Sequence, residues 1–183
     1  MKINQTTNEQ FESHGFLPAD YTMPANVSSY LKIADGEEFK LRILGTPIIG
    51  YIYFNTENKP VRSRTAFDRL PSDIGKNKLD PTKQAEVKHF WAMPIYNITS
   101  GDIQIWEITQ KTIMTKITDL VKDADWGSPL GYDIKIKREK TNIVSYTITP
   151  SNKSAISDEI TTAFIARPVN LNALFDGADP FAI

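Results

Sequence analysis

The sequence predicts a mostly-β domain with one helix set among its strands. Residues 38–150 contain five segments with the apolar spacing of strands, and the period becomes helical only between the third and the fourth. Turn residues join the second strand to the third and the fourth to the fifth, as in hairpins. This order is that of the five-stranded Greek-key barrel called the OB-fold. We therefore predict an all-β fold with one helix over residues 30–150, an N-terminal arm over 1–29, and a linker and tail over 151–183.

The first strand is predicted over residues 38–54. Its first part, EFKLRIL, alternates apolar with charged side chains, which predicts one buried and one basic face. Gly45, Thr46 and Pro47 interrupt this pattern. The segment IIGYIYF then resumes it with β-branched and aromatic residues that fit a pleated sheet. Because Gly and Pro within a strand are typical of a bulge or a bend, we interpret 38–54 as one long bent strand. The alternative is a hairpin of two strands.

The second and third strands form a predicted hairpin. They cover residues 88–97 and 103–108, and TSGD at 99–102 supplies the turn between them. Pro94 cannot donate a backbone hydrogen bond, so its place in the second strand indicates an edge or a bulge.

A helical period follows the third strand. Thr109 is the expected N-cap, and the helix is expected to end before Gly127. Residues 132–138 and 143–149 then form a second hairpin. A short helix is expected at 158–165, ahead of an extended C-terminal end.

Composition excludes several kinds of site. The chain has 183 residues, no cysteine and two histidines, so disulfides, thiolate nucleophiles, zinc-cysteine sites and histidine-rich metal cages are not expected. We expect no cofactor. The N-terminus lacks an apolar stretch, and no run of about 18 apolar residues occurs, so neither secretion nor membrane spanning is indicated. A cytoplasmic location is expected.

Patterns of catalytic residues are weak. The nucleophile-elbow, P-loop, zinc-protease and calcium-loop motifs are absent from the sequence. Asp123 and Asp125 have a spacing that suits Mg²⁺, but a solvated helix end explains them better. His89 suits a general base, but a packed or surface strand histidine is the more ordinary interpretation. We therefore expect neither an enzyme nor a metal site.

Charge is distributed unevenly along the chain. Residues 38–150 contain 17 Lys and Arg against 13 Asp and Glu, whereas 1–37 contain 2 against 5 and 151–183 contain 2 against 4. A basic middle between acidic ends favours a polyanion as the partner of the predicted barrel.

The connection over residues 55–87 is long for a compact domain, and such connections are usually functional or disordered. With Lys88 it carries eight cations against five acids. Beside a groove these cations would neutralise nucleic-acid phosphates and give salt-sensitive affinity without sequence preference, whereas the alternative is a solvated loop. The cations expected at the interface are Lys59, Arg62, Arg64, Arg69, Lys76, Lys78 and Lys88, with Lys135 and Lys137 pointing outward from the fourth strand.

Aromatic side chains gather on the first three predicted strands, whose exposed face is the usual binding surface of OB-folds. Flat rings there would stack on bases, for about 1 to 3 kcal/mol per base and with little preference among bases. Alternation puts Tyr51 with Tyr53, and Trp91 with His89, on common faces. A core position is the alternative for each ring, and it is expected for Phe90. The stacking candidates are Tyr51, Tyr53, Phe54, Trp91, Tyr96 and Trp106.

The last residues, ALFDGADPFAI, combine a few acids with apolar anchors. One interpretation is a tethered peptide that offers Asp176, Asp179 and Phe181 to a basic, hydrophobic pocket of a partner protein, or that covers the protein's own cationic groove. The alternative is a frayed or packed C-terminus.

Several stretches resemble a known family. YLKIADGEEFKLRILGTPIIGYIYF, NKPVRSR, KHFWAMPIYN, IQIWEITQKTIM and WGSPLGYDIKIKRE resemble the OB-fold single-stranded DNA-binding proteins of tailed phages, over residues 30 to about 150. The ending DPFAI is similar to the Pro-Phe tips with which bacterial single-stranded DNA-binding proteins recruit replication and repair partners, although it is less acidic and continues past the Phe. Zinc-containing phage relatives have cysteines that this chain lacks, so no zinc module is implied.

The resemblance and the residues together imply sequence-independent binding and protection of single-stranded DNA in phage replication or recombination. The expected partners are single-stranded DNA and, through the tail, replication or recombination proteins, with no membrane. If a phage encodes the chain, the expected cytoplasm is that of the host cell. Three alternatives stay open: an RNA- or structure-specific binding domain, an adaptor module that uses the barrel for protein contacts, and, ranked third, an enzyme such as a nuclease accessory with Mg²⁺.

Overall fold

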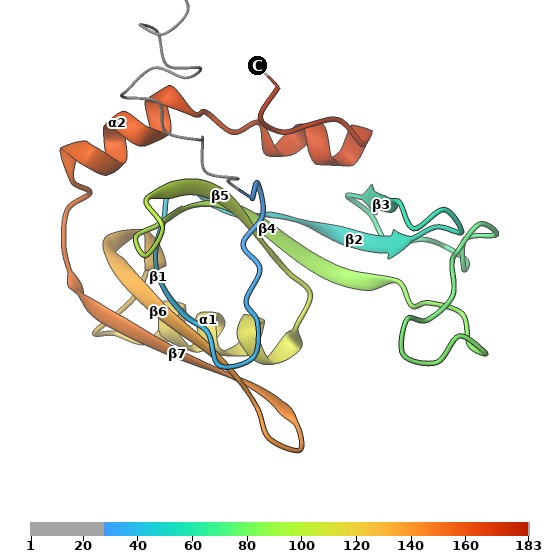
Figure 1. The fold of residues 1–183 in the computed structure, drawn as a ribbon. Coiled ribbons are helices and arrows are strands. Elements are labelled where there is room, and N and C mark those ends of the chain that lie inside the picture. The colour runs from blue at the N-terminus through green and yellow to red at the C-terminus, as the bar shows by residue number, and fades with distance from the viewer. Residues whose placement is uncertain (1–27, 183) are drawn as a thin grey trace, which may run out of the picture.

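The computed structural model describes residues 28–182 and shows one antiparallel sheet of seven strands that does not close, with two α-helices (Figure 1). The prediction of a mostly-β fold is confirmed. The predicted five-stranded barrel with one helix is wrong, because the sheet of the described residues has seven strands and is open, and a second α-helix follows it in the chain. The N-terminal arm predicted over 1–29 lies almost wholly outside the described residues. The elements are β1 (Glu38–Ile43), β2 (Ile48–Phe54), β3 (Pro60–Ser63), β4 (Lys88–Asn97), β5 (Asp102–Ile108), α1 (Lys111–Lys122), η1 (Pro129–Gly131), β6 (Tyr132–Lys140), β7 (Val144–Lys153), α2 (Asp158–Ala166) and η2 (Leu171–Asp176).

Strand β4 organises the sheet, whose order is β3-β2-β4-β1-β6-β7, with β5 on the other edge of β4. Both β1 and β2 pair with β4 in the antiparallel sense, Ile43 opposite Ile95 and Ile48 opposite Ala92. The hairpin alternative for residues 38–54 is therefore wrong, because β1 and β2 lie end to end along one partner. The chain between β1 and β2 has two more residues than the facing part of β4. Because two is an even number, the odd-numbered residues of β1, β2 and β4 all lie on the same side of the sheet.

The part of the sheet made by β2, β3 and residues 88–92 of β4 reaches past the rest of the sheet (Figure 1), and we call it the extension. The connection over 55–87, predicted without regular structure, contributes β3, which pairs with β2 from Tyr51–Ser63 to Phe54–Pro60. Further bridges join Asn55 to Ile74 and Lys76 to Gln84. Backbone pairing therefore fixes much of the connection beside β2.

The main core lies between α1 and the strands. Ile113, Met114 and Ile117 of α1 are buried against a cluster that includes Leu41 and Ile43 of β1. The helix begins one residue later than predicted, with Gln110 at the N-cap position and no side-chain cap, so Thr109 is not the N-cap. The predicted end before Gly127 is confirmed.

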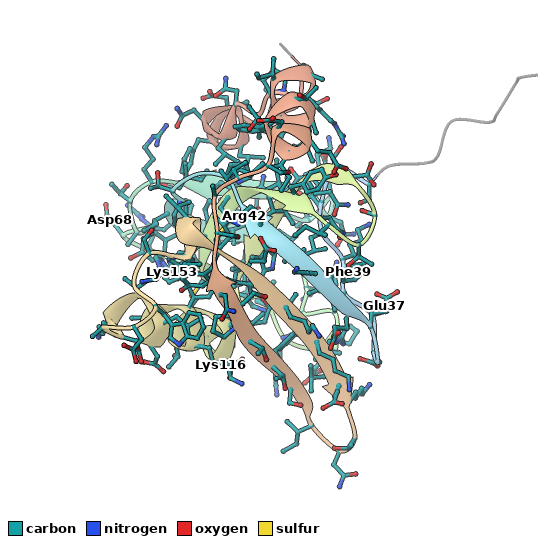
Figure 2. All side chains as sticks on the ribbon, turned by 90° about the vertical axis from the view of Figure 1, so that its left-hand side faces the viewer. Glu37, Phe39, Arg42, Asp68, Lys116 and Lys153 are labelled. Carbon is teal, nitrogen blue, oxygen red and sulfur yellow. The ribbon has the colours of Figure 1, made fainter. Side chains whose placement is uncertain are left out.

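Strands β1 and β6 carry charged side chains that form ion pairs with one another, and Arg42 of β1 is labelled in Figure 2. The basic face predicted for the first strand is only partly present, because Arg42 is 2% exposed and its Nε donates to Asp133 Oδ1 at 2.7 Å. The guanidinium also donates to the Ser154 carbonyl oxygen at 3.0 Å. A buried guanidinium with these acceptors ties β1 to β6 and to the chain after β7, and it is not available to a ligand.

The C-terminal region packs against the sheet, on the side opposite α1 (Figure 1). The short helix predicted at 158–165 is confirmed as α2, whose Ser157 cap accepts from Ile160 N at 3.3 Å. The expected extended end instead contains the 3₁₀ helix η2, in which Leu174 is 2% exposed.

Candidate nucleic-acid interface

The extension has two faces with different surroundings. Its open face consists of Ile49 and Tyr51 of β2 with His89 and Trp91 of β4, which are cross-strand neighbours. Its covered face consists of Gly50, Ile52, Phe90 and Ala92, over which η2 places Leu174 and Phe175. Alternation along the two strands produces this division.

Three flat rings lie side by side on the open face. Tyr51 and His89 stand opposite each other across β2 and β4, with ring centroids 5.4 Å apart and planes inclined by 63°. Trp91 follows His89 by two residues on the same face, and its Nε1 donates to His89 Nε2 at 3.2 Å. His89 is exposed, Tyr51 and Trp91 are half-buried, and Ile49 is 52% exposed. This arrangement gives solvent access to aromatic side chains whose orientation is fixed by mutual contacts.

Tyr53 lies on the same side of β2 as Tyr51, but its side chain is buried. Phe67 packs edge-on against its ring at 5.3 Å, and its hydroxyl donates to Asp73 Oδ1 at 2.8 Å. Burial raises the pKa of the Tyr53 hydroxyl above its usual value, and the bond to Asp73 adds to this effect. The expectation that Tyr53 stacks on a base is therefore corrected, because the connection 55–87 folds back over it.

Two other stacking candidates belong to the interior. Trp106 is 3% exposed in the main core, and Tyr96 is 5% exposed beneath α2, with its hydroxyl donating to Glu159 Oε1 at 3.0 Å. Neither ring can reach a base at the surface, which corrects both expectations. Phe90 is fully buried as expected, and Phe54 is 38% exposed beyond the covered face.

Three of the cations predicted in the connection 55–87 are engaged by the protein itself. Arg62 pairs with Glu107 at 2.8 Å and its side chain is 6% exposed, so it is corrected from a ligand contact to a structural ion pair. Arg64 lies over the Phe175 ring at 4.1 Å and donates to Asn172 Oδ1 at 2.9 Å. Lys59 pairs with Glu57 at 2.7 Å in the exposed turn between β2 and β3, where Asn58 adopts φ 58°.

The other predicted cations fall into two groups. Lys135 pairs with Glu38 at 3.4 Å and Lys137 with Glu139 at 2.6 Å, on the β1–β6 side and away from the extension. Within residues 28–182, no carboxylate lies within ion-pair distance of the exposed cations of the second group, which are Arg69, Lys76, Lys78 and Lys88. All four belong to the connection or to the first residue of β4, so the uncompensated positive charge borders the extension.

The tail lies against its own domain. Arg167 lies over the Phe181 ring at 4.1 Å, and Asn170 N donates to the Pro180 carbonyl oxygen at 2.8 Å. Asp179 Oδ1 accepts from Phe181 N at 2.9 Å, while Asp176 ends η2 at the surface. This arrangement agrees with a packed C-terminus and places Phe181 in contact with the sheet. Presentation of these residues to a partner protein stays a prediction.

His89 and Ile49 are the members of the open face that the sequence did not single out as ligand contacts. The alternation that paired His89 with Trp91 was a usable signal, since the Tyr51–His89 pairing completes the set. In the described part of the chain, no group of three His, Asp or Glu side chains is arranged to hold a metal ion. No helix among these residues has the length and apolar character to cross a bilayer.

Comparison with known proteins adds no assignment, because no protein-family model, no curated protein and no solved structure matches the chain. The resemblance to phage single-stranded DNA-binding proteins therefore stays a prediction from the residues quoted above.

Proposed function

We propose that the protein binds single-stranded DNA without sequence preference, with the open face as its stacking surface. The observation that carries this proposal is the cluster of Tyr51, His89 and Trp91, three rings on adjacent strands within reach of solvent. Base stacking on protein rings is worth about 1 to 3 kcal/mol per base, and every base offers a flat face. A duplex hides its base faces inside the stack, so exposed rings favour an unpaired strand.

The uncompensated cations beside the extension supply the second part of the proposal. Arg69, Lys76, Lys78 and Lys88 are exposed on the extension and on the connection that borders it. The three lysines lie on the side of the strands opposite the rings, so a bound DNA strand would meet them around the edge of the extension. Contacts of lysine and arginine with phosphates release condensed counterions, which makes affinity fall as salt rises. The proposed role is therefore coating and protection of single strands in replication or recombination, with no chemical step.

The chain order supports an OB-type arrangement as the framework. If β1 and β2 count as one bent strand, the succession is this strand, β4, β5, α1, β6 and β7, which has the helix between the third and fourth strands. β3 is then an insertion in the first long connection. Since β5 and β7 do not pair among the described residues, the proposed barrel is open on that side.

Tryptophan fluorescence tests the stacking proposal. Trp91 is half-buried on the open face, Trp106 is in the core, and Trp126 packs on Tyr132 at 5.4 Å away from the extension. Titration with oligo-dT should quench emission of the wild type and of Trp126→Phe, but not that of Trp91→Phe. Binding of Trp91→Phe, followed by anisotropy of a labelled strand, should stay near that of the wild type because a phenyl ring still stacks.

Loss of the rings should weaken binding itself. Trp91→Ala and Tyr51→Ala should each reduce affinity for oligo-dT by about 5- to 150-fold, the equivalent of one stacked base. Equal affinity for duplex and single strand, or unchanged affinity in the double variant, would refute the proposal. A competition between oligo-dT and oligo-rU in the same assay decides between DNA and RNA.

An exposed isoleucine favours one alternative. Ile49, beside Tyr51 and Trp91, adds an apolar element that suits protein contact as well as it suits a nucleic acid. If Ile49→Asp and Tyr51→Ala change self-association in sedimentation and leave strand affinity intact, the surface is a protein-binding module.

A further inference from the structure

A cavity of about 350 Å³ lies on the side of the sheet that carries the covered face, beyond the part reached by η2. Ile52 and Phe54 of β2 and Lys88 of β4 line one wall, and residues 76–79 with 85 and 86 line the other. Its size is within the usual range for small-molecule sites, about 300 to 1,000 Å³. The open face and this cavity lie on opposite sides of the same strands.

The wall opposite β2 is held by backbone contacts. Gly75 N donates to the Phe54 carbonyl oxygen at 2.8 Å, and Ala85 N donates to the Gly75 carbonyl oxygen at 2.8 Å. A Cβ at Gly75 would stand 2.6 Å from the Asn55 carbonyl oxygen, so only glycine permits this close approach. Asn77 Oδ1 accepts from Leu79 N at 2.8 Å and stabilises the turn at the rim. The segment that bears the cavity's lysines is thus anchored to the end of β2.

The charge of the cavity is positive. Lys76, Lys78 and Lys88 line it, and no carboxylate of residues 28–182 lies within ion-pair distance of them. Of the two lining carboxylates, Glu107 is compensated by Arg62 at 2.8 Å, which leaves Glu86 against three ammonium groups. Ammonium groups are strong ligands of phosphate.

An aromatic ring completes the set. Phe54 is 38% exposed at the cavity wall, and Lys78 Nζ lies 5.0 Å from its ring centroid. A flat group that lies against this ring would have a cation beside it, with Leu79 and Ile52 as further apolar neighbours. The cavity therefore offers a flat apolar surface and an anion site a few ångströms apart.

We propose that this cavity binds one nucleotide unit, with its base against Phe54 and its phosphate between Lys76, Lys78 and Lys88. A free mononucleotide and the phosphorylated end of a strand share this chemistry. The cavity lies across the sheet from the rings, so the inference does not rest on the proposed stacking, but the two proposals share Lys76, Lys78 and Lys88 as phosphate contacts.

Calorimetric titration of the full chain with 5′-dTMP, thymidine and inorganic phosphate tests the site. We expect dTMP to bind at least about tenfold more tightly than either fragment, since only the nucleotide has both groups. Lys78→Gln and Phe54→Ala should each weaken dTMP by about tenfold. The matched control is Lys83→Gln, because Lys83 belongs to the same segment, pairs with Asp80 at 3.1 Å and does not line the cavity.

Three outcomes would overturn the proposal: no dTMP binding at millimolar concentration, phosphate binding as tight as dTMP, or an equal loss in Lys78→Gln and Lys83→Gln. Competition of dTMP by 5′-phosphorylated (dT)₅, compared with unphosphorylated (dT)₅, shows whether a strand end enters the cavity. Because dTMP in the cavity lies across the sheet from Trp91, it should leave the Trp91 emission unchanged. Failure of either site can therefore be recognised without reference to the other.

Discussion

The open and covered faces of the extension are built from the same two strands, and they differ in what lies over them. Residues of β2 and β4 contribute rings to both, Tyr51 and Trp91 on one side and Phe90 on the other. The covered face is closed by Leu174 and Phe175, which come from more than 80 residues farther along the chain. On the open face Ile49 is 52% exposed and His89 is exposed, while Trp91 is half-buried against the main core.

This difference makes the open face the candidate surface for a ligand, whereas the covered face contributes to stability. Gly50 provides a measure of the contact, since a Cβ there would stand 2.4 Å from the Ser63 carbonyl oxygen and 3.1 Å from the Phe175 ring. Chains packed that closely leave no room for a base. On the open face, Tyr51 and Trp91 keep part of their surface in water, where burial against a base would be favourable.

The largest expected effect is a loss of folding stability when a residue that packs on the covered face is truncated. Leu174→Ala should lower the free energy of unfolding by about 2 to 5 kcal/mol, because it empties a buried site beneath η2, and it should change strand affinity less than twofold. Denaturant unfolding measures the free energy of unfolding, and the fluorescence anisotropy of a labelled oligo-dT measures the affinity for the DNA strand.

Leu79 provides the matched control for this experiment. It is 97% exposed, so Leu79→Ala should leave the free energy of unfolding within about 0.5 kcal/mol of the wild type. If Leu174→Ala is too unstable to purify, Leu174→Met preserves the volume and should cost less than about 1.5 kcal/mol. A gain in strand affinity in either Leu174 variant would mean that the covered face is a second binding surface under the tail.

A smaller effect marks the boundary of the open face, where Tyr53 is sealed by Phe67 and Asp73. Burial, and secondly the Asp73 bond, raise the Tyr53 pKa in the folded protein above the unfolded value of about 10. The unfolded chain therefore releases its proton first as pH rises, so stability is complete below about pH 10 and is lost as pH rises through the folded pKa.

Tyr53→Phe should weaken this alkaline loss of stability. The variant should flatten the dependence of unfolding free energy on pH between about pH 9 and 11, as followed by urea titration. Part of the slope should remain, since burial also raises the pKa of Tyr96 and Tyr132. An unchanged slope would show that Tyr53 already reaches water and belongs to the open face.

The contrast between Trp91 and Trp106 shows what the sequence could predict. Alternation correctly placed strand residues on shared faces. The spacing of apolar residues and the turn residues together predicted the mostly-β fold, α1 and the hairpins, because these features depend on neighbours a few residues apart. It could not tell an exposed ring from a buried one. Trp106 is sealed by the main core and Tyr96 by α2, which are tertiary contacts with no local signature.

The cations teach the same lesson through ion pairs. Arg62 and Lys88 were equivalent in the sequence as basic residues near one predicted groove, yet Arg62 is held by Glu107 of β5 whereas Lys88 is uncompensated within the described chain. The pairing depends on the register of β4 with β2 and β5, which puts Arg62 and Glu107 on one side of the sheet. Net charge over a segment could not reveal which cations stay available.

The smallest expected effect concerns the salt dependence of DNA affinity. It compares cations beside the extension with cations on the β1–β6 side. Arg69→Gln and Lys88→Gln should each lower the slope of log affinity against log salt by about 0.7 to 1, one phosphate contact apiece. Lys135→Gln and Lys137→Gln should leave that slope unchanged, because each lysine already pairs with a glutamate on the β1–β6 side. The slopes come from anisotropy titrations at several salt concentrations. Equal reductions in all four variants would mean that the strand responds to the protein's total charge, and the path beside the extension would lose its support.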